Sequence, residues 1–174
     1  NPTDAKGLLN AAIEDPNPVL FFEHKYLYRS LKEEVPEAYY TTEIGKANLV
    51  STGDDLTIIT YGLGVHWAVE EMQNRPEIQA EIIDLRSLVP LDTETIYASV
   101  KKTGRAIVLH EDCISGGIGG ELTALITEHC FEYLDAPVLR VGSLNSPVPF
   151  AATIEAIFLP QDRFTKAVDQ LLNY

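Results

Sequence analysis

The stretch RAIVLHEDCISGGIGGEL, residues 105–122, decides the fold class of this chain. Its first five residues are mostly apolar and partly β-branched, which is typical of a buried strand. Four glycines follow between residues 116 and 120, and apolar residues then recur at helical spacing from Ile118 to Cys130. The pattern predicts a strand, a glycine-rich loop and a helix of roughly 14 residues, the repeating unit of an α/β sheet.

The glycine-rich loop has two interpretations, which the residues alone leave open. Backbone N–H groups at a helix start bind anions, and a His beside acids suits general acid–base chemistry, so His110, Glu111, Gly116 and Gly117 form a candidate ligand site. The alternative is a structural turn. No Lys-Ser/Thr pair follows the last glycine, the dinucleotide spacing is not met, and Glu121 would repel a phosphate.

No other residues make a convincing catalytic or metal site by themselves. Gly62 and Gly64 imitate a nucleotide-binding loop, but Trp67 occupies the third glycine position. Cys113 paired with His129 would be a nucleophile, yet no oxyanion loop or orienting acid can be named. The remaining histidines show no metal-ligand spacing: His24, His66 and His129.

Strands and helices alternate from residue 47 onward, which predicts a mainly parallel sheet covered on both faces. The expected strands are 48–50, 56–60, 82–85, 105–109 and 137–141, and the expected helices follow Gly64 and span 93–102, 118–130 and 162–172.

The part of the chain before residue 47 has a different pattern. Residues 4–15 predict an amphipathic helix capped by Asp4, residues 19–22 predict a strand, and residues 26–42 predict an extended connector at a domain boundary. A single helix and strand cannot form a sheet, so this part needs partners from elsewhere.

Composition narrows the class of partners. The net charge of −13 argues against nucleic acid and anionic membranes, and no apolar run approaches the roughly 20 residues of a membrane span. The two cysteines lack redox or metal spacing, which favours a reduced, intracellular protein. Because the chain starts at Asn1 without Met, we expect a piece of a longer protein.

Six collinear segments together resemble one known family. They are NPTDAKGLL (1–9), FEHKYLYR (22–29), EIIDLRSLVPLD (81–92), His110-Glu111 with Gly116-Gly117, DAP (135–137) and PVPF (147–150). As a set they resemble the beta subunit of the thiamine-diphosphate-dependent 2-oxo acid dehydrogenases. One departure is Asn145-Ser146-Pro147, where relatives usually have Asp-Thr-Pro.

The resemblance implies a fold and a domain division. Residues 46–174 would form a transketolase C-terminal domain, a three-layer α/β/α sandwich on a five-stranded, mostly parallel sheet with one antiparallel edge strand. Residues 1–25 would be the last helix and strand of a preceding pyrimidine-binding domain, and residues 26–45 a linker.

The resemblance also implies an activity for the parent protein. That enzyme would oxidatively decarboxylate a branched-chain 2-oxo acid or pyruvate on thiamine diphosphate and Mg²⁺, and pass the acyl group to lipoyl. The family's catalytic and cofactor residues lie upstream of Asn1 or in the alpha subunit, so we expect this chain to contribute no catalytic, cofactor-binding or metal residue, to bind no cofactor and to be inactive alone. A bacterial cytoplasmic location is expected.

The expected role of this chain is assembly. Its partners would be the alpha subunit, a second beta subunit, and the small basic subunit-binding domain of the lipoyl acyltransferase, which would contact Asp135 and the terminal carboxylate of Tyr174. Two alternatives remain open: another thiamine enzyme with this domain, such as transketolase or deoxyxylulose-phosphate synthase, and a free-standing α/β ligand-binding domain that uses the loop 116–120.

Overall fold

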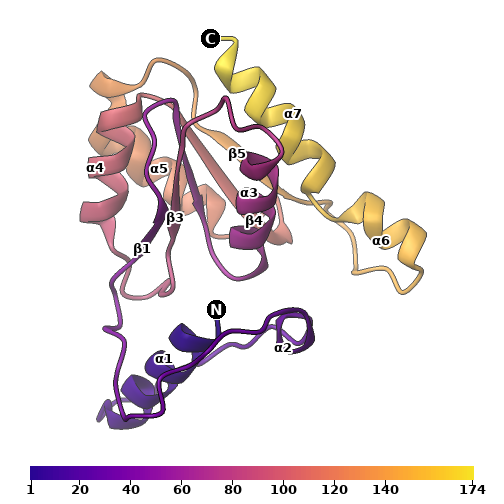
Figure 1. Cartoon of the computed structure of the whole chain (residues 1–174). Helices are drawn as coiled ribbons and strands as arrows, with labels where there is room; N and C mark the ends of the chain where they lie inside the picture. The colour runs from indigo at the N-terminus through magenta and orange to yellow at the C-terminus, as the bar shows by residue number, and fades with distance from the viewer.

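The computed structural model describes residues 1–174, which form a sheet domain and a smaller N-terminal region, residues 1–45 (Figure 1). The strands are β1 (Asn48–Ser51), β2 (Leu56–Thr60), β3 (Ala80–Asp84), β4 (Ala106–Cys113) and β5 (Leu139–Ser143). The helices are α1 (Pro2–Glu14), α2 (Leu27–Ser30), α3 (Leu63–Gln73), α4 (Thr93–Thr103), α5 (Gly119–Cys130), the 3₁₀ helix η1 (Phe131–Tyr133), α6 (Ala152–Phe158) and α7 (Gln161–Leu172).

The five strands form one sheet in the order β1-β3-β2-β4-β5. β1 pairs with β3 in antiparallel orientation, and every other pair is parallel because a helix carries the chain back between successive parallel strands. Helices α3 and α7 cover one face and α4 and α5 cover the other (Figure 1). The prediction of a three-layer sandwich with one antiparallel edge strand is confirmed.

Two separate hydrophobic clusters hold the layers together, one on each face of the sheet. Adjacent residues of β2 belong to opposite clusters, Ile58 to the α3/α7 side and Ile59 to the α4/α5 side, because side chains alternate along a strand. All five residues of β2 and of β3 are buried, as expected for parallel strands covered on both faces.

Two expectations for the N-terminal region were wrong. Helix α1 is capped by Asn1, whose Oδ1 accepts from the backbone N–H of Asp4, and the Asp4 side chain is instead buried against the domain. Residues 19–22 are extended but belong to no strand, because no neighbouring strand lies beside them to complete a ladder. The connector also contains the short helix α2, which its pattern did not predict.

The glycine-rich stretch also differs from its expected layout. β4 continues to Cys113 because β5 runs beside it and pairs Ser143 with Cys113, so His110 and Glu111 lie on a strand rather than in the loop. Helix α5 is 12 residues long, shorter than expected, since it begins only at Gly119. Asp92 caps α4 as predicted.

Candidate functional site

The carboxyl edge of the sheet contains the place where open α/β folds bind ligands. β2 and β4 are parallel neighbours, and the chain leaves β2 for α3 on one face and β4 for α5 on the other. A crevice at such a switch point is the usual ligand site of an open α/β sheet. Here Tyr61 follows β2, and His110, Glu111 and Asp112 lie at the end of β4.

His110 is directed into the protein rather than into the crevice. Its side chain is fully buried, and Nδ1 lies 3.0 Å from the carbonyl oxygen of Asp112. A carbonyl only accepts, so Nδ1 carries the proton, and the unpartnered Nε2 faces Gly119 at the start of α5. Burial lowers the pKa of His110, so the ring is neutral at neutral pH.

Three glycines make room for this ring. A Cβ atom would come within 2.8 Å of the His110 ring at Gly117, 2.5 Å at Gly119 and 2.7 Å at Gly142. Two of these glycines come from the glycine-rich stretch, so part of that motif is required by packing around a buried histidine. The geometry therefore favours the structural interpretation of Gly117 and His110 over a ligand site.

Gly116 has a separate, local reason to be glycine. Its φ is +83°, in the left-handed region, and a Cβ atom there would meet nothing within 4 Å. The loop beside it is fixed by Ser115, whose N–H donates to Asn145 Oδ1 at 3.0 Å. Gly116 therefore serves the turn itself, at the surface, and does not face His110.

The carboxylates of Glu111 and Asp112 have different partners. Glu111 Oε2 lies 2.7 Å from His24 Nε2 of the N-terminal region, whereas Asp112 Oδ1 accepts from the backbone N–H of Cys113 at 2.7 Å. Burial and the negative charges of Asp112 and Glu111 raise the pKa of the Tyr61 hydroxyl. The structure does not bring His110 and Glu111 together on one ligand.

A second contact with the N-terminal region lies just after β3. Arg86 Nη2 is 2.7 Å from Asp4 Oδ1, and the Asp4 side chain is 8% exposed. Arg86 has φ +54°, a left-handed conformation that non-glycine residues rarely adopt. Its backbone N–H donates to Asp84 Oδ1, and burial raises the pKa of Asp84.

The two predicted docking residues lie at the opposite end of the domain. Asp135 is exposed in the turn between η1 and β5, where its backbone N–H donates to the carbonyl of Gly104 at 2.8 Å. Tyr174 is also exposed. Figure 1 places the C-terminus and the loop that contains Asp135 at the same upper end of the domain.

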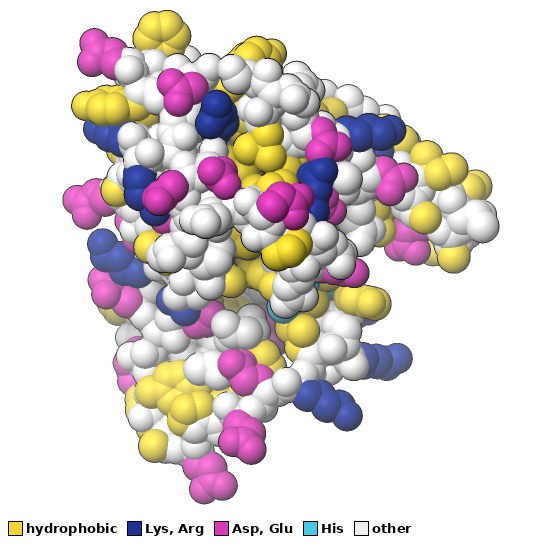
Figure 2. Space-filling view, turned by 45° about the horizontal axis from the view of Figure 1, so that its top comes forward, with side chains coloured by type: hydrophobic (Ala, Val, Ile, Leu, Met, Phe, Trp, Pro, Cys, Tyr) yellow, Lys and Arg dark blue, Asp and Glu magenta, His cyan; other side chains and the backbone are white.

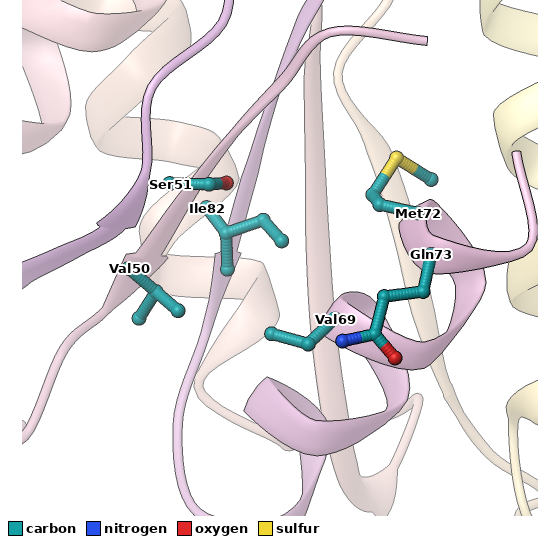
Figure 3. Close-up of a pocket in the computed structure, with 6 residues that line it drawn as sticks. All are labelled: Val50, Ser51, Val69, Met72, Gln73 and Ile82. Atoms are coloured by element: carbon teal, nitrogen blue, oxygen red, sulfur yellow. The ribbon is translucent and has the colours of Figure 1, made fainter. Parts of the chain in front are cut away.

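A shallow groove of about 280 Å³ separates β1 from α3, and its walls are mostly apolar (Figure 3). It is lined by Val50, Ser51, Val69, Met72, Gln73 and Ile82. Ser51 Oγ donates to the carbonyl of Ala80 at 2.8 Å, so it is already partnered. Because polar groups do not converge here, the groove lacks the means to orient a small molecule.

The comparisons with known proteins decide the family. The model of the transketolase C-terminal domain matches residues 45–163. The chain belongs to this family. A solved split-gene transketolase, described as an inactive beta4 tetramer, aligns with a TM-score of 0.64 at 27% identity, over 80% of this chain and 46% of that chain.

Curated relatives of this transketolase C-terminal domain protein are beta subunits. The 2-oxoisovalerate dehydrogenase subunit beta of Bacillus subtilis is 45% identical over 99% of this chain and 54% of the relative. The pyruvate dehydrogenase E1 component subunit beta of the same organism is 48% identical over 93% of this chain and 50% of the relative. The resemblance to 2-oxo acid dehydrogenase beta subunits is confirmed, and the chain spans about half the length of these relatives.

The residues of this transketolase C-terminal domain protein do not fit a site for thiamine diphosphate with Mg²⁺. No group of three or more His, Cys, Asp or Glu side chains is placed to hold a metal ion. The glycine-rich loop 116–120 packs in part around His110, and Glu121 adds negative charge to the first turn of α5. No helix of the structure is both long and apolar enough to cross a bilayer.

Sequence reasoning missed the contacts with the N-terminal region. Nothing in the periodicity of residues 1–25 indicated that Asp4 or His24 has a charged partner in the domain. One signal was available for the partners themselves: Arg86 follows the buried strand β3 and Glu111 lies near the end of β4, at the edge where α/β sheets place functional side chains.

Proposed function

We propose that this chain is part of the beta subunit of a 2-oxo acid dehydrogenase. One observation supports this more than any other. The transketolase C-terminal domain model matches only residues 45–163, whereas similarity to the 2-oxoisovalerate dehydrogenase beta subunit covers 99% of the chain. The N-terminal region therefore matches too. A protein sharing only the domain does not account for that extra similarity, and the split-gene transketolase aligns with 80% of the chain.

The proposed parent reaction is oxidative decarboxylation of a 2-oxo acid with transfer of the acyl group to lipoyl. A branched-chain 2-oxo acid is the proposed substrate, and pyruvate is the alternative supported by the second relative. Thiamine diphosphate with Mg²⁺ would supply the carbanion chemistry in the parent enzyme. Because the residues of this chain do not fit that group, we assign it no step and no catalytic residue here.

The proposed role of the chain within the parent is assembly with an alpha subunit and a second beta subunit. Large apolar side chains are exposed on the N-terminal region, among them Leu20 at 86% and Phe22 at 88%. Figure 2 shows broad hydrophobic areas on the lower part of the molecule, bordered by acidic side chains. The helix α6 extends away from the domain and carries exposed Ile154 and Ile157 (Figure 1). Exposed apolar surface of this extent is typical of interaction sites.

A chimera tests the proposed activity. The matching portion of the Bacillus subtilis 2-oxoisovalerate dehydrogenase beta subunit is replaced by this chain and assembled with that enzyme's alpha subunit. We expect decarboxylation of 2-oxoisovalerate within roughly tenfold of the parental rate, a loss of under about 1.4 kcal/mol. A chimera that assembles yet decarboxylates neither 2-oxoisovalerate nor pyruvate contradicts the proposal.

The proposed acyltransferase contact has its own test. A basic module is attracted to a chain of net charge −13, and Asp135 offers an exposed carboxylate at the end of the domain where the Tyr174 side chain is also exposed. Binding of the basic subunit-binding domain is measured for wild type and Asp135→Ala at low and moderate salt. We expect weaker binding in the variant and at higher salt; affinity that changes with neither contradicts this docking site.

Two measurements on the chain itself complete the proposal. Calorimetry with thiamine diphosphate and Mg²⁺ is expected to show no binding, and micromolar affinity would contradict the assignment of the cofactor to other parts of the parent. Light scattering is expected to show self-association through the exposed apolar surface, and a clean monomer at tens of micromolar would contradict it.

A further inference from the structure

The carboxyl edge of the sheet is contacted by the chain's own N-terminal region. Strands β3, β2 and β4 are neighbours in the sheet, and their carboxyl ends carry Arg86, Tyr61 and Glu111 respectively. The two outer residues of this row each bind the N-terminal region, Arg86 through Asp4 and Glu111 through His24. The row therefore meets the N-terminal region at two separated points.

The Asp4–Arg86 contact is an ion pair that is largely shielded from solvent. Both groups are largely removed from water, with side-chain exposures of 8% for Asp4 and 20% for Arg86. Removing one partner of a buried pair leaves the other charge uncompensated, so such a pair depends on both members. The left-handed backbone of Arg86 is a local strain, and strained residues persist where their surroundings require that conformation.

Each partner of this pair is also held from its own side. Asp4 Oδ2 accepts from Asn1 Nδ2 at 2.7 Å, so the N-cap of α1 also orients the carboxylate. Arg86 is oriented by its N–H bond to Asp84 Oδ1 at 3.1 Å, immediately after β3. The first turn of α1 and the end of β3 are therefore linked through a chain of hydrogen bonds.

The His24–Glu111 contact fixes the second point. His24 Nε2 and Glu111 Oε2 are 2.7 Å apart, with side-chain exposures of 29% and 39%. His24 follows the extended residues 19–22, which pair with no strand. Because one contact alone leaves a segment free to pivot, the contact of α1 through Asp4 and that of the later residues through His24 together define the orientation of residues 1–25 on the sheet.

We propose that Arg86 and Glu111 form a two-point clamp that makes the carboxyl edge of this sheet a docking surface for residues 1–25. The occupant of this docking surface is thus the chain's own preceding segment, and both residues act as positioning residues. The inference rests on the proposed function only in that residues 1–25 then belong to a preceding domain, whose orientation the clamp sets.

The test is a charge-swap series on the 174-residue chain, read by amide hydrogen exchange of α1 and of the sheet. Asp4→Arg and Arg86→Asp are each expected to speed exchange of the α1 amides at least tenfold while the β2 and β4 amides are unchanged. The combined swap is expected to restore α1 protection to within about threefold of wild type. Generic loss of structure would not be rescued in this way.

Further variants separate the effect of backbone strain at Arg86 from the effect of losing its ion pair, and test the second contact. Arg86→Gly relieves the left-handed backbone and Arg86→Ala retains it, yet both are expected to release α1 because both remove the guanidinium. Arg75→Ala is the matched control: it removes an ion pair to Asp169 on α7 and is expected to leave α1 exchange unchanged. His24→Ala and Glu111→Ala are each expected to speed exchange around residues 19–25, with no added effect when combined.

The outcomes are distinct. Unchanged α1 exchange in Asp4→Arg and Arg86→Asp, or a loss that the combined swap does not rescue, overturns the clamp. α1 protection that Arg86→Gly retains also overturns it. An inactive chimera combined with the expected exchange pattern overturns the proposed function and leaves the clamp intact.

Discussion

The sheet domain and the N-terminal region are stabilised by different kinds of contact. Of the 44 buried residues, only Asp4 and Gly7 lie in residues 1–45, and all others belong to the domain. The domain has two continuous apolar clusters, whereas the N-terminal region has none. The domain therefore has its own source of folding free energy, because burial of apolar surface is the dominant favourable term in folding. The N-terminal region instead depends on its attachment to the domain.

Polar contacts hold the N-terminal region together internally. The Tyr40 hydroxyl donates to the Thr3 carbonyl at 2.8 Å, Asn10 Nδ2 donates to the Tyr40 carbonyl at 2.8 Å, and Lys6 Nζ reaches the Ala38 carbonyl at 2.9 Å. Each such bond contributes only about 1 kcal/mol net, because water competes for the same groups. This region therefore has an ordered backbone with little burial.

Leucine truncations should give the largest difference between the two regions. Leu109→Ala removes a fully buried side chain from β4 and is expected to lower the free energy of unfolding by about 2–5 kcal/mol. Leu9→Ala, on the 42%-exposed face of α1, is expected to cost less than about 1 kcal/mol. Urea unfolding followed by the fluorescence of Trp67, the only tryptophan, measures both. Equal losses would contradict the contrast.

The packing around His110 should give the next largest effect. Gly119→Ala places a Cβ 2.5 Å from His110 Nε2 and is expected to cost about 1–3 kcal/mol through overpacking. Gly120→Ala is the matched control in the same helical turn, where the nearest atom to the added Cβ is Nη1 of Arg140 at 3.7 Å, so it is expected to be neutral or slightly stabilising. If Gly120→Ala were as costly as Gly119→Ala, the role of the ring would be wrong.

Acid sensitivity should give the smallest effect. Burial lowers the pKa of His110 below its ordinary 6.5, so the unfolded state binds more protons between those two values. The stability that this residue contributes is complete above pH 6.5 and declines as the pH falls below it. Urea unfolding from pH 7.5 to 5.5 measures the slope, which is expected to be shallower in His110→Gln.

His66 and the carboxylates must be separated from this slope. Burial also lowers the pKa of His66, so a slope remains in His110→Gln and only the difference between the two proteins counts. Hydrogen bonds lower the pKa of Asp92 below its ordinary 3.8 despite burial, so its contribution is lost only in stronger acid. An identical slope in wild type and His110→Gln would contradict a neutral, buried His110.

Local patterns were sufficient to predict most of the domain. Buried parallel strands have continuous apolar runs in the sequence, and the helices have apolar residues at a 3.6-residue period. Consequently β2, β3, α4 and α7 lie close to where they were predicted. Helix α6 was missed because nearly all of its residues are exposed and it therefore has no buried stripe. The antiparallel edge strand came from the family resemblance, since strand direction has no local signal.

The contacts at the carboxyl edge were beyond sequence reasoning for a physical reason. His24 and Glu111 are 87 residues apart, and a side chain's partner at that distance is set by the tertiary fold. The packing of glycines around His110 could be predicted only in part. Gly117 and Gly119 belong to the glycine-rich stretch, but the third glycine against the ring, Gly142, comes from β5. Only the parallel pairing of β4 with β5 brings it to His110.

Removal of residues 1–45 tests the central claim that the domain folds on its own core and the N-terminal region is attached to it. The chain 46–174 is expected to unfold cooperatively, to keep the near-ultraviolet dichroism of Trp67, and to lose less than about 2 kcal/mol of its unfolding free energy, because only polar contacts are removed. The peptide 1–45 alone is expected to be largely unfolded, since the 13 residues of α1 are near the marginal length for an isolated helix. An unfolded chain 46–174, or a stably helical peptide 1–45, would contradict the account.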